Sequence, residues 1–191
     1  MLERKFAENL ENFLLHEPRK ILLVNGARQI GKSYLIRYVG KKLFKHFVEI
    51  NLKADQEGDG IFKTVRSKED FYLQLGAMAG NNLGSKDDTL VFLDEIQSYP
   101  HLMTMLKFLN EDGKYRYVAS GSQLGVALSQ TPSVPIGSIA VQQMYPLDFE
   151  EFLWALNNET LMPLIRMNFQ KRHEMGQMMH RMAMDYFRQY L

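Results

Sequence analysis

The feature that most constrains the fold is the segment Gly26–Ser33, which reads Gly-Ala-Arg-Gln-Ile-Gly-Lys-Ser. It matches the spacing G-x-x-x-x-G-K-[ST], in which the glycines let the backbone curl so that its N–H groups face phosphate oxygens. The segment follows an apolar run, Ile21–Val24, and opens a stretch with helical periodicity. This order of strand, glycine-rich loop and helix predicts a phosphate-binding loop, because the positive end of the helix dipole attracts an anion.

Individual residues of this loop have predicted roles. Lys32 reaches the β- and γ-phosphates of a nucleotide, and the Ser33 hydroxyl is a ligand for Mg²⁺. Arg28 touches the nucleotide, orders the loop or contacts a neighbouring chain. The residues predicted to bind the nucleotide are Gly26, Ala27, Arg28, Gln29, Ile30, Gly31, Lys32, Ser33, Tyr34 and Ser120.

A second motif is the apolar run at residues 90–93, which ends in two adjacent carboxylates, Asp94 and Glu95. The carboxyl ends of parallel strands face the ligand in α/β sheets. Asp94 is therefore predicted to hold Mg²⁺ through water, alongside Ser33, while Glu95 polarises the water that attacks the γ-phosphate. Lys32 and Glu95 are the predicted catalytic residues. A water-activating glutamate disfavours a small-molecule kinase, and the absence of an N-K-x-D segment disfavours GTP.

Strand-like and helix-like segments alternate along most of the chain. We expect helices at 2–16, 31–39, from 67 onward and at 100–109, and strands at 21–24, 46–52, 89–94, 115–119 and 139–142. Residues 53–60 are expected to form a loop because they are charged and contain two glycines. The alternation predicts an α/β fold: a three-layer α/β/α P-loop NTPase with a parallel central sheet, followed by a C-terminal helical segment.

Composition excludes several classes of protein. The chain has 191 residues, of which 46% are hydrophobic and 24% charged, as in ordinary globular domains. It contains no cysteine, which excludes disulfides, cysteine-ligated zinc, iron–sulfur clusters and a thiol nucleophile. A net charge of +1 does not support DNA as a partner. Apolar runs are far shorter than the about 20 residues of a membrane span, so we expect a cytoplasmic protein without membrane contact.

Together, the two motifs resemble the additional-strand, catalytic-glutamate class of P-loop ATPases, which includes the AAA+ proteins. A fuller set of segments resembles a prokaryotic AAA-like ATPase family, over essentially the whole chain: Asn25–Gln29, Asp94–Gln97, Ser120–Ser122 and Tyr145–Leu153. In that family the ATPase domain is normally followed by a winged-helix-like segment and a C-terminal domain of restriction-endonuclease-like fold.

The resemblance also implies a γ-phosphate sensor at the end of the strand that follows the acidic pair. Ser120 occupies that position, although a Ser-Gly turn that caps the strand is an equally good interpretation. Many relatives carry a Gly-Arg pair upstream of the last segment, whereas this chain has Gly137-Ser138. No arginine finger is therefore assigned.

The pattern becomes wholly helical from Leu147. We expect residues 1–146 to form the P-loop ATPase domain and residues 147–191 a helical segment, the start of a lid or winged-helix-like region that is cut short at 191. One face of the last helix is apolar and should pack against the core or another helix; it carries Met175, Met179, Met182, Tyr186 and Tyr190.

These observations predict an ATPase that uses Mg²⁺ and ATP as cofactors to drive a conformational change. One alternative is a nucleotide-gated switch or binding module that hydrolyses slowly or not at all, and another is a P-loop kinase. The sequence does not identify the work that hydrolysis drives. Besides ATP, the open partners are another protein, a second copy of the chain, and DNA.

Overall fold

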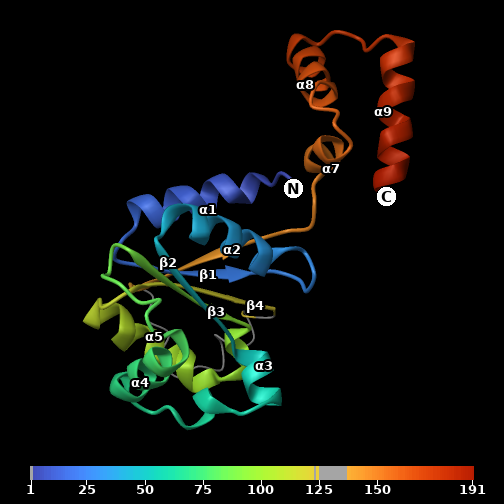
Figure 1. The fold of residues 1–191 in the computed structure, drawn as a ribbon. Helices are drawn as coiled ribbons and strands as arrows, with labels where there is room; N and C mark the ends of the chain where they lie inside the picture. The colour runs from blue at the N-terminus through green and yellow to red at the C-terminus, as the bar shows by residue number, and fades with distance from the viewer. Residues whose placement is uncertain (1, 123, 125–136) are drawn as a thin grey trace. The chain divides into compact units, whose positions relative to one another are not determined.

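The computed structural model describes residues 2–122, 124 and 137–191 (Figure 1). The described chain divides into two compact units. The larger unit is Asn9–Tyr145, and the smaller one combines the segment that ends at Glu8 with Pro146–Leu191. Every helix among these residues is too short or too polar to cross a membrane.

The larger unit is built on a five-stranded sheet with the order β2-β3-β4-β1-β5. Its strands are β1 (Ile21–Asn25), β2 (His46–Asn51), β3 (Thr89–Asp94), β4 (Arg116–Gly121) and β5 (Ile139–Gln143). All neighbouring strands run parallel. In the register, Asn25 lies opposite both Gly121 and Gln143, so three strands end together at one edge. Strand β4 separates β1 from β3, which places their axes about 10 Å apart.

Helices cover both faces of this sheet. They are α1 (Lys5–His16), α2 (Lys32–Leu43), α3 (Leu52–Glu57), α4 (Lys68–Ala79) and α5 (Pro100–Asp112), with short 3₁₀ turns η1 (Ile61–Thr64) and η2 (Ile96–Ser98). Helix α2 lies on one face, and α4 and α5 lie on the other (Figure 1). Because both faces are covered, β3 and β4 are buried along their whole length. The predicted three-layer α/β/α fold with a parallel sheet is confirmed.

Two local predictions are corrected by packing and capping. Residues 52–57 form helix α3 rather than part of a loop, because the Asn51 side chain accepts a hydrogen bond from Ala54 N at 2.9 Å and Leu52 is fully buried. Helix α2 continues to Leu43, beyond the predicted end at residue 39, and includes Gly40. Gly40 lies against the ring of Phe47, where a Cβ would come within 2.5 Å of a ring carbon, so the glycine serves close packing. The predicted start of α4 at Ser67 is confirmed by a capping box.

The smaller unit contains three helices among the residues described, α7 (Phe149–Ala155), α8 (Leu161–Lys171) and α9 (Gln177–Tyr190). Leu153, Leu161 and Ala183 form its buried centre. Met179 and Tyr186 pack against that centre, as expected for the apolar face of the last helix. Met182 differs from the prediction because 39% of it is exposed, and Met175 precedes α9.

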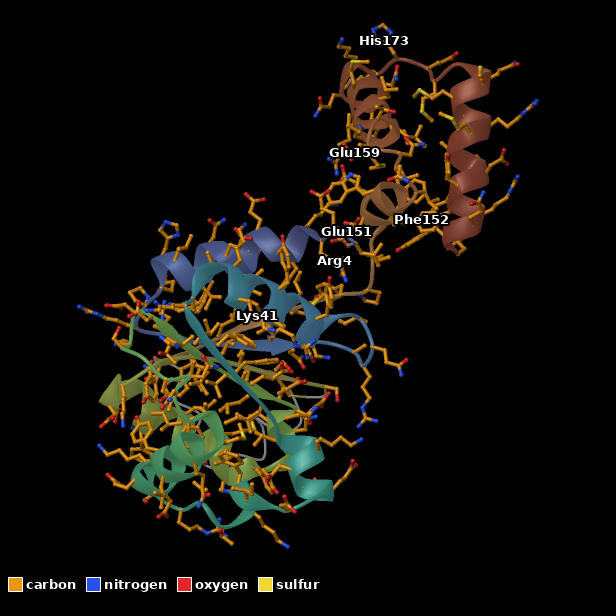
Figure 2. The ribbon with its side chains drawn as sticks, viewed as in Figure 1. Arg4, Lys41, Glu151, Phe152, Glu159 and His173 are labelled. Atoms are coloured by element: carbon orange, nitrogen blue, oxygen red, sulfur yellow. The ribbon has the colours of Figure 1, made fainter. Side chains whose placement is uncertain are left out.

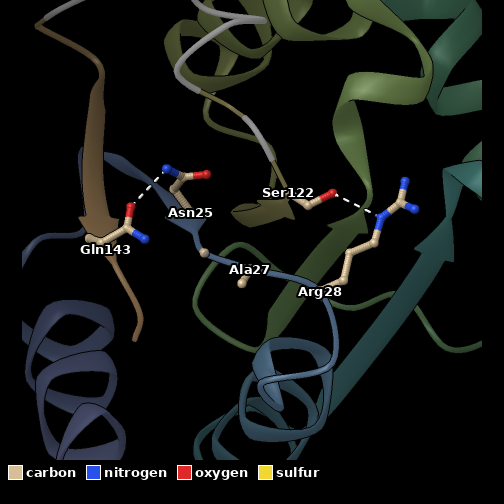
Figure 3. Close-up of a pocket in the computed structure, with 6 residues that line it drawn as sticks. Asn25, Ala27, Arg28, Ser122 and Gln143 are labelled. Carbon is tan, nitrogen blue, oxygen red and sulfur yellow. Dashed lines mark hydrogen bonds between the residues drawn. The ribbon is translucent and has the colours of Figure 1, made fainter. Parts of the chain in front are cut away.

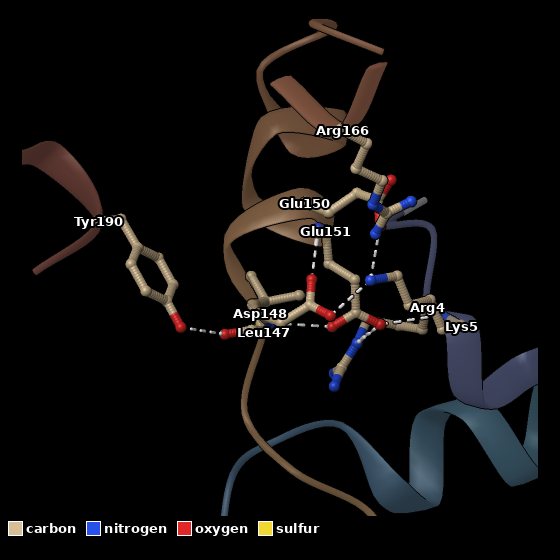
Figure 4. A network of polar contacts seen from close by, with 8 residues as sticks. All are labelled: Arg4, Lys5, Leu147, Asp148, Glu150, Glu151, Arg166 and Tyr190. Carbon is tan, nitrogen blue, oxygen red and sulfur yellow. Dashed lines mark hydrogen bonds and ion pairs between the residues drawn. The ribbon is translucent and has the colours of Figure 1, made fainter. Parts of the chain in front are cut away.

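The N-terminal residues contact α7 through a network of charges. Figure 2 labels Arg4 and Glu151, and Figure 4 shows the contacts around them. Arg4 Nε lies 3.2 Å from a carboxylate oxygen of Glu151, and Lys5 Nζ lies 2.7 Å from Glu150. Lys5 N also donates to Glu151 at 2.8 Å. The residues up to Glu8 thus belong to the same compact unit as the C-terminal helices, and the division into an ATPase domain at 1–146 and a helical segment at 147–191 stays a prediction.

Candidate functional site

The loop between β1 and α2 has backbone geometry that explains its two glycines. Gly31 has a φ of 94°, a left-handed conformation that favours glycine. Gln29 also lies in the left-handed region, with a φ of 64°. At Gly26 the constraint is space, because a Cβ there would lie 2.5 Å from the carbonyl oxygen of Met144. Successive residues can therefore curl tightly where the strand ends.

Lys32 is the first residue of α2 and is only 5% exposed. Its ammonium donates to the carbonyl oxygens of Gly26 at 2.9 Å and Ala27 at 2.7 Å. Burial lowers the pKa of Lys32, while the charges of Glu95 and Asp94 oppose that shift and the charge of Arg28 adds to it. A buried cation whose direct contacts are neutral carbonyls is well placed to attract an anion.

The acidic pair ends strand β3. Asp94 is 5% exposed and accepts hydrogen bonds from the fully buried Ser120 hydroxyl and from Glu95 N, the latter at 3.1 Å. Glu95 has a φ of 55°, where the chain leaves the strand and enters η2. The register places Ser120 at the end of β4, opposite Val24 of β1. Ser120 thus contacts the carboxylate that was predicted to hold the metal.

Two residues that sequence reasoning did not assign contact this site. Gln97 Nε2 donates to a carboxylate oxygen of Glu95 and lies 3.4 Å from the Ser122 hydroxyl. Arg28 Nε donates to the same hydroxyl at 3.4 Å (Figure 3). Gln97 and Ser122 both lie inside segments that carried the family resemblance, but their residue types alone indicate no role.

A pocket of about 530 Å³ opens beside the loop (Figure 3). It is lined by Asn25, Gly26, Ala27, Arg28, Ser122 and Gln143. The Asn25 amide donates to Gln143 at 2.7 Å and accepts from Leu124 N at 3.1 Å, so it ties the ends of β1 and β5 to the chain after β4. This volume is within the usual range for small-molecule sites, about 300–1,000 Å³.

The remaining predicted residues lie in the loop and in the first turn of α2, and they do not line this pocket. Ser33 is half-buried in the first turn of α2, Ile30 is half-buried in the loop, and Tyr34 is 54% exposed. A hydroxyl and a carboxylate, from Ser33 and Asp94, are oxygen donors of the kind that Mg²⁺ prefers. Among the residues that the structure describes, no group of three or more His, Cys, Asp or Glu side chains could hold a metal ion. The donors present suit a cation that shares its coordination with water and a bound phosphate.

The fold and this site define a class. A glycine-rich loop between a strand and a helix, with an acidic pair two strands away on a parallel sheet, characterises a P-loop nucleotide-binding domain. The chain belongs to the AAA domain family, whose sequence profile matches residues 18–153. It is therefore an ATPase-type nucleotide-binding module. The predicted resemblance to AAA ATPases is confirmed at this level, while the endonuclease-like C-terminal domain stays a prediction.

Solved structures of Hsp104 share the fold. An S. cerevisiae Hsp104–ADP complex has a TM-score of 0.56 and 13% sequence identity, over 84% of this chain. A closed-state reconstruction of Hsp104 with ATPγS and FITC casein has a TM-score of 0.56 and 12% identity, over 81%. This chain spans 24% and 28% of the length of those two chains. No curated protein matches it.

Proposed function

We propose that this chain binds ATP together with Mg²⁺ at the loop Gly26–Ser33 and hydrolyses the ATP to drive a conformational change. The observation that carries this proposal is the buried Lys32 ammonium. It is buried, and its contacts within the loop are the neutral carbonyls of Gly26 and Ala27, so its charge is available to an anion. The acidic pair that would act on water lies at the end of β3, two strands away from β1 in the same parallel sheet.

Each residue has a role in this proposal. Lys32 and the loop N–H groups bind the phosphates, and Ser33 and Asp94 hold the metal. When bound, Mg²⁺ would offset the negative charge of the β- and γ-phosphates. Ser120 fixes the Asp94 carboxylate, and Glu95 orients a water molecule and accepts its proton. Catalysis then consists mainly of positioning and charge stabilisation.

Substituting Lys32 tests the binding step. Lys32→Ala removes a charge-assisted contact worth about 1.5–3 kcal/mol, so ATP affinity should fall by about ten- to a hundredfold. Lys41→Ala is the matched control, since Lys41 is an exposed lysine of the same helix (Figure 2) and should leave the affinity unchanged. Titration calorimetry measures both, with melting temperatures to confirm folding. Equal affinities in the parent and in Lys32→Ala would contradict the assignment of the loop.

A second candidate is a nucleotide-gated switch that hydrolyses slowly or not at all. It uses the same phosphate-binding groups, because the buried Lys32 and the loop would bind a nucleotide whether or not Glu95 acts on water. Phosphate release at saturating Mg·ATP separates the two functions. Tight binding without measurable release would favour the switch, whereas steady release that depends on Glu95 favours the ATPase.

A further inference from the structure

We propose that Gln97 is a positioning residue for Glu95, and that it links the Glu95 carboxylate to the phosphate loop through Ser122 and Arg28. The inference rests on the proposed function, because it requires Glu95 to be the group that acts on water. It concerns a residue that neither the loop motif nor the acidic pair includes.

The first observation is the contact itself. Glu95 leaves strand β3 in a left-handed conformation, and its carboxylate accepts a hydrogen bond from the amide of Gln97. Gln97 lies two residues further on in η2, a turn of only three residues. This hydrogen bond fixes the direction of the Glu95 carboxylate. Misplacing a catalytic group by about 1 Å can reduce a rate by about 10².

The second observation is how Gln97 is seated. A Cβ at position 121 would lie 2.2 Å from Gln97 Oε1, so the space that this amide oxygen occupies exists because Gly121 has no side chain. Oε1 is buried and has no hydrogen-bond partner among the described residues. An unpaired buried acceptor is unfavourable, so an apolar side chain of the same size would stabilise the fold more at position 97. The amide nitrogen, which donates to Glu95, explains why a glutamine stands here.

The third observation connects Gln97 to the loop. Gln97 Nε2 and Arg28 Nε both lie 3.4 Å from the Ser122 hydroxyl. Arg28 belongs to the loop predicted to bind phosphate, and it adds a positive charge that lowers the pKa of Lys32. Contacts of 3.4 Å are longer than ordinary N–H···O hydrogen bonds, which are about 2.7–3.2 Å, so they are weak and can be exchanged at small energetic cost. A nucleotide that draws Arg28 toward its phosphates would thus alter the contacts of Ser122, and through them Gln97.

Turnover tests the positioning role. Gln97→Leu keeps a side chain of similar size but removes the donor to Glu95. We expect kcat to fall by about 10- to 100-fold, with KM and the Kd of a fluorescent ATP analogue within a few-fold of the parent. Gln56→Leu is the control, since the Gln56 amide donates at 3.1 Å to Ser98 O of the same turn and does not contact Glu95. It should retain parental kcat.

A double-substitution cycle excludes a merely structural effect. If Gln97 acts through Glu95, Gln97→Leu should cause no further loss of kcat in a Glu95→Gln background. A parental kcat in Gln97→Leu, or a full additional loss in that background, would overturn the inference while leaving ATP hydrolysis by Glu95 intact. A parent that binds ATP without hydrolysing it would instead contradict the proposed function.

Nuclear magnetic resonance tests the link to the loop independently of turnover. The side-chain amide protons of Gln97 should shift in Glu95→Gln, and they should shift again when the parent binds Mg·ATP or a non-hydrolysable analogue. Arg28→Ala should abolish most of the nucleotide-dependent shift. Amide resonances of Gln97 that do not change in either experiment would overturn the inference.

Discussion

Asp94 is a buried carboxylate whose contacts at the site are hydrogen-bond donors rather than cations. The Ser120 hydroxyl and Glu95 N both donate to its Oδ1 oxygen. These contacts fix the orientation of the carboxylate and leave its charge available to a metal ion. We therefore propose that Ser120 orients a metal ligand, a role that can be separated from direct contact with the γ-phosphate.

Ser120→Ala distinguishes these two roles. Removing a group that orients a metal ligand typically lowers metal affinity by about 10–100-fold. The Mg²⁺ concentration needed for half-maximal ATP binding should therefore be at least about tenfold higher than in the parent. Titration of Mg²⁺ at fixed ATP measures this. Ser85→Ala is a matched control, because Ser85 donates to the carboxylate of Asp88 at 2.8 Å on an exposed surface. A reduced rate with an unchanged Mg²⁺ requirement would instead assign Ser120 to the γ-phosphate.

The conformation of the loop after β1 depends on the neighbouring strand β5 and the residue that follows it. Met144 N donates to Asn25 O at 2.8 Å, and the Met144 carbonyl covers Gly26. The segment that leaves β5 is thereby fixed against the entrance of the loop. A substitution at Gly26 must displace the main chain at Met144 and the side chain of Ile30, which are the atoms that a Cβ would meet.

Gly26→Ala should therefore destabilise the fold by about 1–3 kcal/mol, which is the usual cost of overpacking. It should also weaken ATP binding, because the loop must move to accept the methyl group. Gly76 provides a contrast within helix α4, because a Cβ there would meet no atom within 4 Å. Gly76→Ala should stabilise the protein by about 1 kcal/mol through helix propensity. Denaturant unfolding measures both changes. A Gly26→Ala variant as stable as the parent, with parental affinity, would show that the loop is less constrained than its packing indicates.

The carboxylate of Glu150 in α7 predicts a dependence on pH. Burial raises its pKa, but hydrogen bonds and charges from Lys5 and Arg166 outweigh burial, so the pKa of Glu150 lies below its ordinary value (Figure 4). A carboxylate with a lowered pKa stabilises the folded state above its unfolded pKa, about 4.3, and loses this contribution as pH falls through the folded pKa.

Glu150→Gln should thus lower stability by about 1 kcal/mol at pH 7, a small value because Lys5 and Arg166 are partly exposed. The difference from the parent should shrink toward zero as the pH falls through the lowered pKa of Glu150. Thermal unfolding across this pH range is the measurement. Glu17→Gln, which removes an exposed pair with Lys20, should change stability by less than about 0.5 kcal/mol. A constant difference between Glu150→Gln and the parent at all pH values would exclude the ionic explanation.

For the molecule as a whole, local patterns predicted the sheet and the centre of the site. The strand residues Leu90–Leu93 are buried on both faces of the sheet. Such strands have continuous apolar sequences, which is why they could be predicted. The glycine loop and the acidic pair can be recognised in the sequence because the chemistry proposed for them requires fixed residue types at fixed spacing.

Contacts between distant segments could not be predicted in this way. Gln97, Ser122 and Arg28 meet because β4 lies between β1 and β3, and strand order is not encoded in any local pattern. The pairing of Arg4 with Glu151 joins residues 147 positions apart. The residues up to Glu8 belong to the same compact unit as the C-terminal helices, which no local pattern indicates. Helix α3 was missed because its stability depends on an Asn51 cap and on burial of Leu52.

We propose above all that Glu95 activates water on an ATP molecule that Lys32 and the loop bind. Glu95→Gln keeps the size and much of the hydrogen bonding of this side chain but cannot accept a proton. Since general-base contributions are about 10²–10⁴-fold, single-turnover hydrolysis should slow by that factor while the Kd for Mg·ATP stays within a few-fold. Hydrolysis at the parental rate by Glu95→Gln, in a preparation whose Lys32→Ala counterpart is inactive, would contradict the claim.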